Sequence, residues 1–282
     1  MNKPLMFGLL SPLLLLVACG GGDTGGGTEA PSPAVVLACA ADASVASPLG
    51  RLHNNTWNRQ AAGSQPWQQC LVRHTVAGAT QYGWQWQWPT GGSDVLAYPS
   101  LVIGAKPWEA GPGNDARFPR PIAATQRLLL DYDLDTSATG TYNLATSVWL
   151  IRTPTVASPP DETAISGELM VWTQSAGADW TAGRVPLAQV SIGGAAWLLW
   201  SQPSWGDASG GSTHRWPLVV YTAVNASSQA RLDLKAFLAD AVARGLLDGS
   251  HHIADVELGN EVAGGSGTTW IRGFSLTVDP AP

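Results

Sequence analysis

Two environments meet on one short segment, Ser166-Gly167-Glu168-Leu169-Met170-Val171-Trp172. Successive side chains of a β-strand point to opposite faces of its sheet. One face of this segment would be apolar and suited to a core, and it carries Ile165, Gly167, Leu169 and Val171. The other face would carry Ser166, Glu168, Met170 and Trp172. A carboxylate between a thioether and an indole is an unusual face for bulk solvent, so the segment predicts a strand with a core face and a groove face.

The second face has the chemistry of a sugar-binding groove. Indoles stack on the C–H faces of sugar rings, and a carboxylate among apolar side chains can be tuned for nucleophilic or acid/base work. The alternative is an ordinary half-exposed strand whose glutamate is solvated, which is the commoner arrangement for a single Glu. A second carboxylate in a similar setting would favour the groove.

That second carboxylate occurs near the C-terminus, between Ile253 and Glu261. Period-two alternation places Ala254, Val256 and Leu258 on an apolar face. The opposite face then carries Glu257, Gly259 and Glu261. Two strands that present Glu in one groove could form a glycosidase pair, in which a carboxyl separation of about 5 to 5.5 Å implies retention and about 6.5 to 9.5 Å implies inversion.

Both segments resemble motifs of family 12 glycoside hydrolases. Gly167 to Trp172 is similar to the nucleophile motif Glu-Ile/Leu-Met-Ile/Val-Trp, and Gly259-Asn260-Glu261 is similar to the acid/base strand, Gly-x-Glu. Phe274 to Val278 resembles the closing strand, and the likeness covers nearly everything after Cys39. It implies that Glu168 is the nucleophile and Glu261 the acid/base, with Met170 packed between them and Trp172 positioning the sugar.

The resemblance implies further substrate-binding residues. Asn54-Asn55-Thr56-Trp57-Asn58 is similar to the family segment Asn-Asn-Leu-Trp-Gly, whose second Asn and Trp line the glycone side of the cleft, and these roles would fall to Asn55 and Trp57. Trp84, Trp86 and Trp88 alternate with Gln and share one face, which makes either a core stripe or a sugar platform. From the family's similar Trp-x-Trp, we expect either Trp86 or Trp88 to reach the cleft.

One position departs from the family pattern. Asn143-Leu144-Ala145-Thr146-Ser147 stands where the family has Asn-Val/Leu-Ala-Tyr/Phe-Asp, with the Asp beside the nucleophile. Asn143 and Ser147 would therefore support the site rather than contact substrate. A Ser147 hydroxyl can donate a hydrogen bond to Glu168 and favour its ionised form, but it cannot share a proton as a second carboxyl does. We expect a shifted pH optimum, with loss of activity as the alternative.

Composition favours an all-β fold. The 282 residues include 32 Gly and 20 Pro, which suit a chain rich in turns. The net charge of −6 argues against nucleic acid as a partner, since a polyanion is bound by clustered Lys and Arg. The 14 Trp, against 4 Phe and 5 Tyr, point to carbohydrate, although about half of the indoles should be core.

The alternating segments predict short strands, including Leu128 to Tyr132 and Tyr142 to Ile151 joined by a turn at 136–140. A single amphipathic helix is predicted over 232–247. This pattern favours a two-sheet antiparallel β-sandwich. The resemblance implies a concanavalin-like jelly roll with the helix packed on its convex side.

The N-terminus has the pattern of an exported lipoprotein. Residues 1–18 read as a signal peptide, because their apolar run is too short to span a bilayer. Leu16-Val17-Ala18-Cys19 resembles a bacterial lipobox, in which Cys19 would be acylated; the alternative is plain cleavage beside an incidental Cys. Residues 19–33 would be the lipidated Cys and a flexible linker, and 34–282 one catalytic domain. We expect the cell envelope, on the outer membrane or cell surface, or secretion.

The remaining cysteines, Cys39 and Cys70, are expected to be bridged, because an even pair in an exported protein is more often a disulfide than free, and family 12 enzymes commonly carry one here. No metal or cofactor is expected, since the cysteines and histidines lack metal-ligand spacing. His214, His251 and His252 would be solvated loop residues.

Together these features predict a retaining endo-acting hydrolase of β-1,4-glucan chains, namely β-glucan, soluble cellulose or xyloglucan. The choice of polymer would depend on the loops after Trp88, Trp108 and Trp180. We expect a monomer that meets the membrane only through its lipid. The alternative is a catalytically weak glucan-binding surface lipoprotein on the same fold, an interpretation that Ser147 favours and the matched Glu pair opposes.

Overall fold

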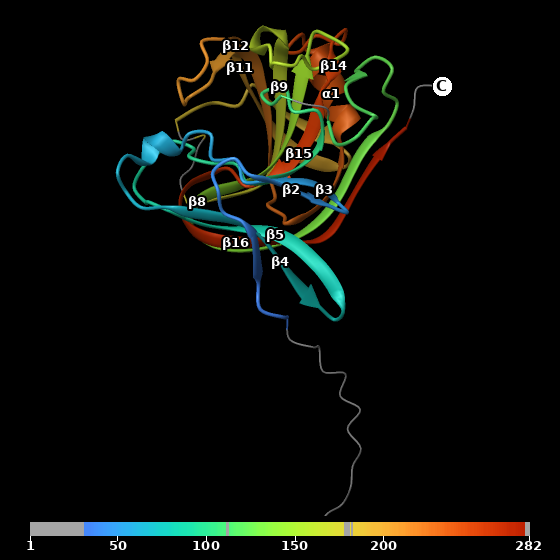
Figure 1. The fold of residues 1–282 in the computed structure, drawn as a ribbon. Helices are drawn as coiled ribbons and strands as arrows, with labels where there is room; N and C mark the ends of the chain where they lie inside the picture. Colours follow the sequence, from blue (N-terminus) through green and yellow to red (C-terminus); the bar gives the residue numbers. More distant parts are fainter. Residues whose placement is uncertain (1–30, 111–112, 178–180, 182, 280–282) are drawn as a thin grey trace, which may run out of the picture.

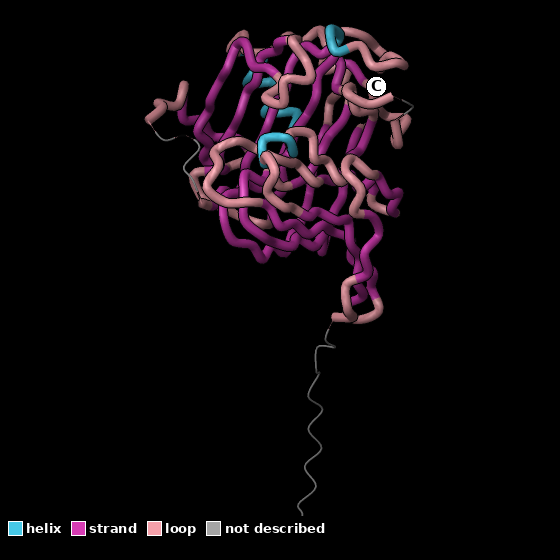
Figure 2. Tube along the Cα trace, turned by 60° about the vertical axis from the view of Figure 1, so that its left-hand side comes forward, coloured by secondary structure: helices cyan, strands magenta, loops and turns pink. Residues whose placement is uncertain are grey.

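The structure is a computed structural model that describes residues 31–110, 113–177, 181 and 183–279. Strands make up most of it, and Figure 2 shows how little of the chain is helical. The elements of the first half are β1 (Val35–Ala38), β2 (Ser44–Ser47), β3 (Gly50–His53), η1 (Arg59–Ala62), β4 (Gln68–Val76), β5 (Ala79–Trp88), β6 (Ser100–Gly104), β7 (Arg120–Pro121) and β8 (Leu128–Ile151). Those of the second half are η2 (Glu162–Ala164), β9 (Ile165–Ala176), β10 (Ala188–Ile192), β11 (Ala195–Gly206), β12 (Arg215–Ala223), β13 (Gln229–Asp233), α1 (Leu234–Ala243), β14 (His252–Ile253), β15 (Asp255–Gly259) and β16 (Val262–Val278).

Strand β8 belongs to both layers of the sandwich. Its first half pairs with β16 and β13, and its second half pairs with β9 on one side and β15 on the other. The layer that carries the predicted groove has the order β10-β11-β12-β9-β8-β15-β6-β3-β2, and the other runs β1-β4-β5-β16-β8. In Figure 1, β8 and β16 sweep together beneath the strands β9, β11 and β12. The pairing of β9 with β12 is parallel, whereas the other ladders are antiparallel.

The turn predicted at 136–140 is wrong. These residues continue β8 as one strand of 24 residues, because each pairs with a residue of β16, from Thr136 opposite Thr269 to Gly140 opposite Gly265. Thr is well suited to a strand, and the partner strand decides between the two conformations. Gly140 has φ of +90°, a value that favours glycine, at the point where β8 changes layer.

The two faces predicted for β9 are confirmed. Leu169 and Val171 are fully buried in the main core. Met170 faces the other way and packs in a smaller cluster of the groove face, together with Tyr98, Ala145, Leu218 and Val220. Trp172 and Trp200 lie at the edge of that cluster and are half-buried. The groove face therefore has an apolar floor of its own.

The predicted α-helix is confirmed as the one α-helix of the described residues, but it is shorter than predicted at both ends. Leu232 and Asp233 belong to β13, and the helix ends at Ala243. The Asp233 side chain caps α1 by accepting a hydrogen bond from the backbone N–H of Ala236 at 3.1 Å. Phe237 packs edge-on against Trp197 and Tyr221, with ring centroids 4.9 and 5.0 Å apart. These contacts place α1 on the face of β11 and β12 opposite the groove, as the helix on the right of Figure 1.

Several expectations concern residues outside the described ranges. They are the signal peptide, the lipid attachment at Cys19, most of the linker, and the part played by Trp180. No helix in the described part of the chain is long and apolar enough to cross a membrane.

The predicted disulfide between Cys39 and Cys70 is present and joins the end of β1 to β4. It closes a loop that contains β2, β3, Asn55 and Trp57. The bridge thus ties the segment that carries two predicted binding residues to the sheet.

Replacing both Cys39 and Cys70 with Ser should lower the free energy of unfolding by about 3 to 4 kcal/mol, because a loop of this size gains that much conformational entropy when the unfolded chain is not cross-linked. Urea unfolding followed by tryptophan fluorescence measures the change. An unchanged midpoint under non-reducing conditions would contradict a stabilising bridge.

Candidate active site

Glu168 lies on the groove face of β9 and is 7% exposed. Its cross-strand neighbours are Trp149 on β8 and Leu218 on β12. The Ser147 hydroxyl donates a hydrogen bond to Oε1 at 2.9 Å, and the Trp216 indole donates to Oε2 at 3.3 Å. Both carboxylate oxygens are therefore engaged by fixed donors, as expected for a group that must hold one orientation.

Glu261 follows β15 and is only partly buried. The Asn143 side chain binds both the side chain and the backbone of Glu261. The Asn143 amide donates to Glu261 Oε2 at 2.5 Å, and its Oδ1 accepts the Glu261 N–H at 3.1 Å. Two residues earlier, the backbone of Gly259 lies close to Pro99. A Cβ at this position would lie 2.4 Å from the Pro99 carbonyl oxygen, so the position requires glycine. The predicted pair thus reaches one face from two strands on either side of β8.

The two carboxyl groups affect each other's ionisation. Burial, followed by the charge of Glu261, raises the pKa of Glu168 to about 8, while the hydrogen bonds from Ser147 and Trp216 oppose the rise. Burial likewise raises the pKa of Glu261 to about 7, against the hydrogen bond from Asn143. Between these values the pair holds one proton, as two interacting carboxyls in a shared site do. An arrangement of this kind suits general acid/base chemistry.

The alternating tryptophans of β5, which are Trp84, Trp86 and Trp88, support the site from inside the core. Trp84 is fully buried, and its indole donates to Asn260 Oδ1 at 2.8 Å. The Asn260 amide in turn donates to the Asn143 carbonyl at 2.9 Å. One chain of hydrogen bonds thus runs from the core to the residue that holds Glu261.

Trp86 and Trp88 are each 3% exposed and belong to the main core, so their burial counts against the expectation that one of them reaches the cleft. Trp88 instead donates to Gln69 Oε1 at 2.9 Å, and the Gln69 amide donates to the Asn55 carbonyl at 3.2 Å. Asn55 is largely buried, and its Oδ1 accepts the backbone N–H of Trp57 at 3.2 Å. Trp57 is half-buried.

Sequence reasoning missed a cluster of three indoles next to Glu168. Trp108, Trp149 and Trp216 contact one another with ring centroids 5.3 to 5.5 Å apart. Trp216 is the member that donates to Glu168. His214, predicted to be solvated, is half-buried against Trp216 and hydrogen-bonds the Ile165 carbonyl at 2.8 Å through Nε2. Only the period-two spacing of Trp216 with Leu218 and Val220 could have placed this indole on the groove face.

A buried ion pair lies beside the same site. Glu257 is fully buried and is the cross-strand neighbour of Ser147. Lys106 Nζ donates to both of its carboxylate oxygens, at 2.8 and 2.9 Å. The sequence placed Glu257 on the groove face, but it gave no signal that Lys106, in a segment rich in Pro and Gly, would meet it.

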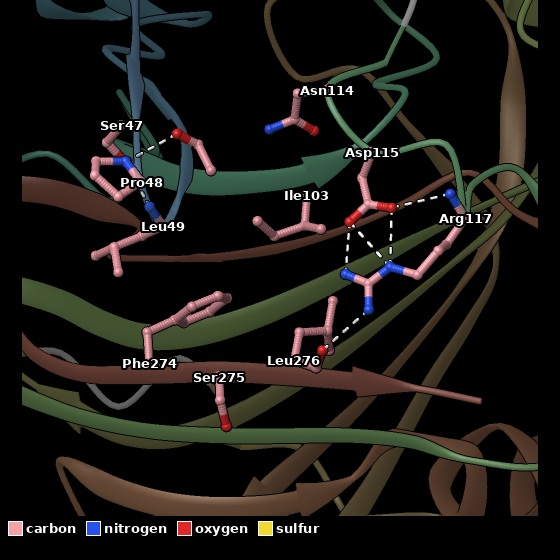
Figure 3. Close-up of a pocket in the computed structure, with 11 residues that line it drawn as sticks. Ser47, Pro48, Leu49, Ile103, Asn114, Asp115, Arg117, Phe274, Ser275 and Leu276 are labelled. Carbon is pink, nitrogen blue, oxygen red and sulfur yellow. Dashed lines mark hydrogen bonds and ion pairs between the residues drawn. The ribbon is translucent and has the colours of Figure 1, made fainter.

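A separate cavity of about 370 Å³ lies away from the carboxyl pair, between the β2–β3 turn, the end of β6 and the end of β16. Figure 3 shows Asp115 and Arg117 facing each other on one wall, with Phe274 and Leu276 on another. The Arg117 guanidinium is already engaged by Asp115, at 2.6 Å, and by the Leu276 carbonyl, at 3.3 Å. The charges of Asp115 and Arg117 in this cavity are therefore already paired with each other.

Known proteins resemble this chain in sequence and in fold. The family model for glycosyl hydrolase family 12 matches residues 50–279. Endoglucanase S of Pectobacterium parmentieri is 28% identical over 231 residues, which cover 80% of this chain and 81% of that protein. A family 12 xyloglucanase from Bacillus licheniformis, solved in complex with ligand, aligns over 89% of this chain and 100% of its own, with 25% identity and a TM-score of 0.72. An endoglucanase from Rhodothermus marinus shares the fold, with a TM-score of 0.66 and 22% identity over 88% of this chain and 100% of its own.

Proposed function

This chain belongs to glycosyl hydrolase family 12 and is a glycoside hydrolase, and we propose that it cuts β-1,4-glucan chains internally with retention of anomeric configuration. The observation that carries the proposal is that two carboxyl groups of one groove, those of Glu168 and Glu261, have different hydrogen-bond partners. Glu168 accepts two fixed hydrogen bonds, and Glu261 is held at the opposite side of β8 by Asn143. Unequal surroundings of this kind separate the roles of nucleophile and acid.

In the proposed mechanism, ionised Glu168 attacks the anomeric carbon while protonated Glu261 gives its proton to the leaving glycosidic oxygen. A covalent glycosyl-enzyme results. Glu261, now ionised, removes a proton from water, and the water attacks the same carbon and releases Glu168. The two inversions give net retention.

Two opposing effects decide which carboxyl group holds the shared proton. The higher pKa of Glu168 would place the proton there, whereas the donors Ser147 and Trp216 favour Glu168 as the ionised partner. Both forms belong to one singly protonated state, so exchange between them leaves the pH limits of activity unchanged. The form with Glu168 ionised is the one that reacts.

The proposed substrate is a neutral glucan chain lying across the groove. Half-buried Trp57, Trp172 and Trp200 offer indole surface for sugar rings, and Met170 gives an apolar floor beside Trp172 and Trp200. The likeness to an endoglucanase and to a xyloglucanase supports linear β-glucan, soluble cellulose or xyloglucan as the polymer. Export and lipid attachment at Cys19 remain a proposal from the sequence, which labelling with a radioactive fatty acid would test.

Replacing Glu168 with Gln should abolish release of reducing ends from β-glucan, because the amide cannot form the glycosyl intermediate. Replacing Glu261 with Gln should slow the polysaccharide reaction by about 10² to 10⁴-fold, the usual contribution of a general acid. An aryl cellobioside, whose leaving group needs no proton, should be affected less by the Glu261 change. Equal loss on both substrates would contradict the role given to Glu261.

The pH profile of kcat/KM should be bell-shaped with an optimum between about 7 and 8, because the reactive state holds one proton on a pair with these raised pKa values. Replacing Ser147 with Ala should move the acid limb upward by roughly 1 pH unit, since a hydrogen bond to a charged group is worth roughly 1.5 kcal/mol.

Ser166→Ala is the matched control for the Ser147 change. Ser166 is a buried residue of β9, two positions before Glu168, and its Oγ has no hydrogen-bond partner within the described ranges. An optimum near pH 5 in the parent protein, or equal limb shifts in the two variants, would contradict the assignment.

A further inference from the structure

The buried pair of Lys106 and Glu257 is connected to the catalytic pair by a short path. Glu257 on β15 lies directly across from Ser147 on β8, and Ser147 donates to Glu168 on β9. The Ser100 hydroxyl donates a third hydrogen bond to Glu257, at 3.1 Å from Oε2. The neighbouring strands β9, β8 and β15 therefore place the Glu257 carboxylate next to Ser147, the residue that donates a hydrogen bond to Glu168.

The loop after β6 holds Lys106 over this carboxylate. Two residues further on, Trp108 packs on Trp149 and Trp216. Glu109 then pairs with Arg51 of β3 at 2.6 Å. The pairing of β6 with β15 anchors the loop before Lys106, and these contacts anchor it afterwards, so the Lys106 side chain, whose residue is only 8% exposed, has a fixed position.

We propose that Lys106 is a positioning residue for catalysis, whose ammonium neutralises Glu257 so that Glu168 can ionise in the buried groove. The proposal rests on the proposed function, in which ionised Glu168 is the nucleophile. An unneutralised carboxylate near Glu168 would disfavour its charged form, since two anions repel strongly where water is excluded. Lys106 would thus set the protonation of a group that it does not touch.

The charge on Lys106 is consistent with its surroundings. Burial alone would lower its pKa, but Glu257, Glu109 and Asp255 together raise it above the usual value. Replacing this side chain with an uncharged one of similar length therefore removes a positive charge from the groove.

Other titratable groups face the pair from the elements around it. Burial and the charge of Glu257 raise the pKa of Asp255 well above its ordinary value, and burial does the same for the pKa of Tyr98. Burial and the charge of Lys106 lower the pKa of His53 to about 2, which makes it neutral as well. Arg51 and Glu109 form an ion pair, and the charge of Glu261 also raises the pKa of Glu168. The Lys106–Glu257 pair thus makes a contribution to the field at Glu168 that is separate from the contribution of Glu261.

The test is a double-mutant cycle read from the acid limb of the kcat/KM profile on a soluble β-glucan. Lys106→Met should move the limb to higher pH, and Glu257→Gln, which leaves an unpaired ammonium, should move it to lower pH, each by about 1 unit or tenfold in rate at a fixed acidic pH. The double variant should return close to the parent profile. Lys106→Arg, which keeps the charge, should leave the limb in place.

A merely structural role predicts a different pattern. Loss of packing would reduce activity at every pH and leave the limb where it is, and that result, or shifts of the same sign in both single variants, would overturn the proposal. If Lys106→Met does not fold, Glu257→Gln alone tests the proposal. A shift of its acid limb to lower pH supports the proposal, and an unchanged limb overturns it. A parent protein without any pH-dependent hydrolysis would instead overturn the proposed function itself.

Discussion

The site depends on the register of one strand, β8, with its two neighbours. Ser147 and Asn143 lie four residues apart on β8 and therefore share a face. Pairing with β9 brings Glu168 within reach of Ser147, and pairing with β15 leads the chain into Glu261 beside Asn143. A slip of one residue in either ladder would turn a carboxyl group into the core. The long strand thus fixes both the fold and the catalytic geometry.

Burial gives these groups their chemistry and also creates the need for partners. A polar group removed from water is destabilising unless it is hydrogen-bonded, and the core tryptophans provide several of the required donors. Trp84 holds Asn260, Trp88 holds Gln69, and Trp216 holds Glu168 directly. The high Trp content therefore serves both purposes: some indoles offer surface to a sugar, and others fix the polar residues behind it.

Much of this could be predicted from the sequence, because alternation is a local signal. The two faces of β9, the disulfide and the existence of one helix followed from residue patterns and from resemblance to a family. The continuous strand through Thr136 and Gly140 could not be predicted, since turn-forming residues were held extended by a partner more than a hundred positions away. The contact between Lys106 and Glu257 is equally non-local, and the core positions of Trp86 and Trp88 depend on which layer covers them.

The stereochemistry of the first product tests the central claim most directly. Proton NMR of a cello-oligosaccharide digest, recorded within minutes of adding the protein and before mutarotation, shows which anomer forms first. Attack by Glu168 followed by water activated by Glu261 predicts the β-anomer, which later equilibrates with the α-form. First appearance of the α-anomer would mean a single displacement by water, and Glu168 could not then be the nucleophile.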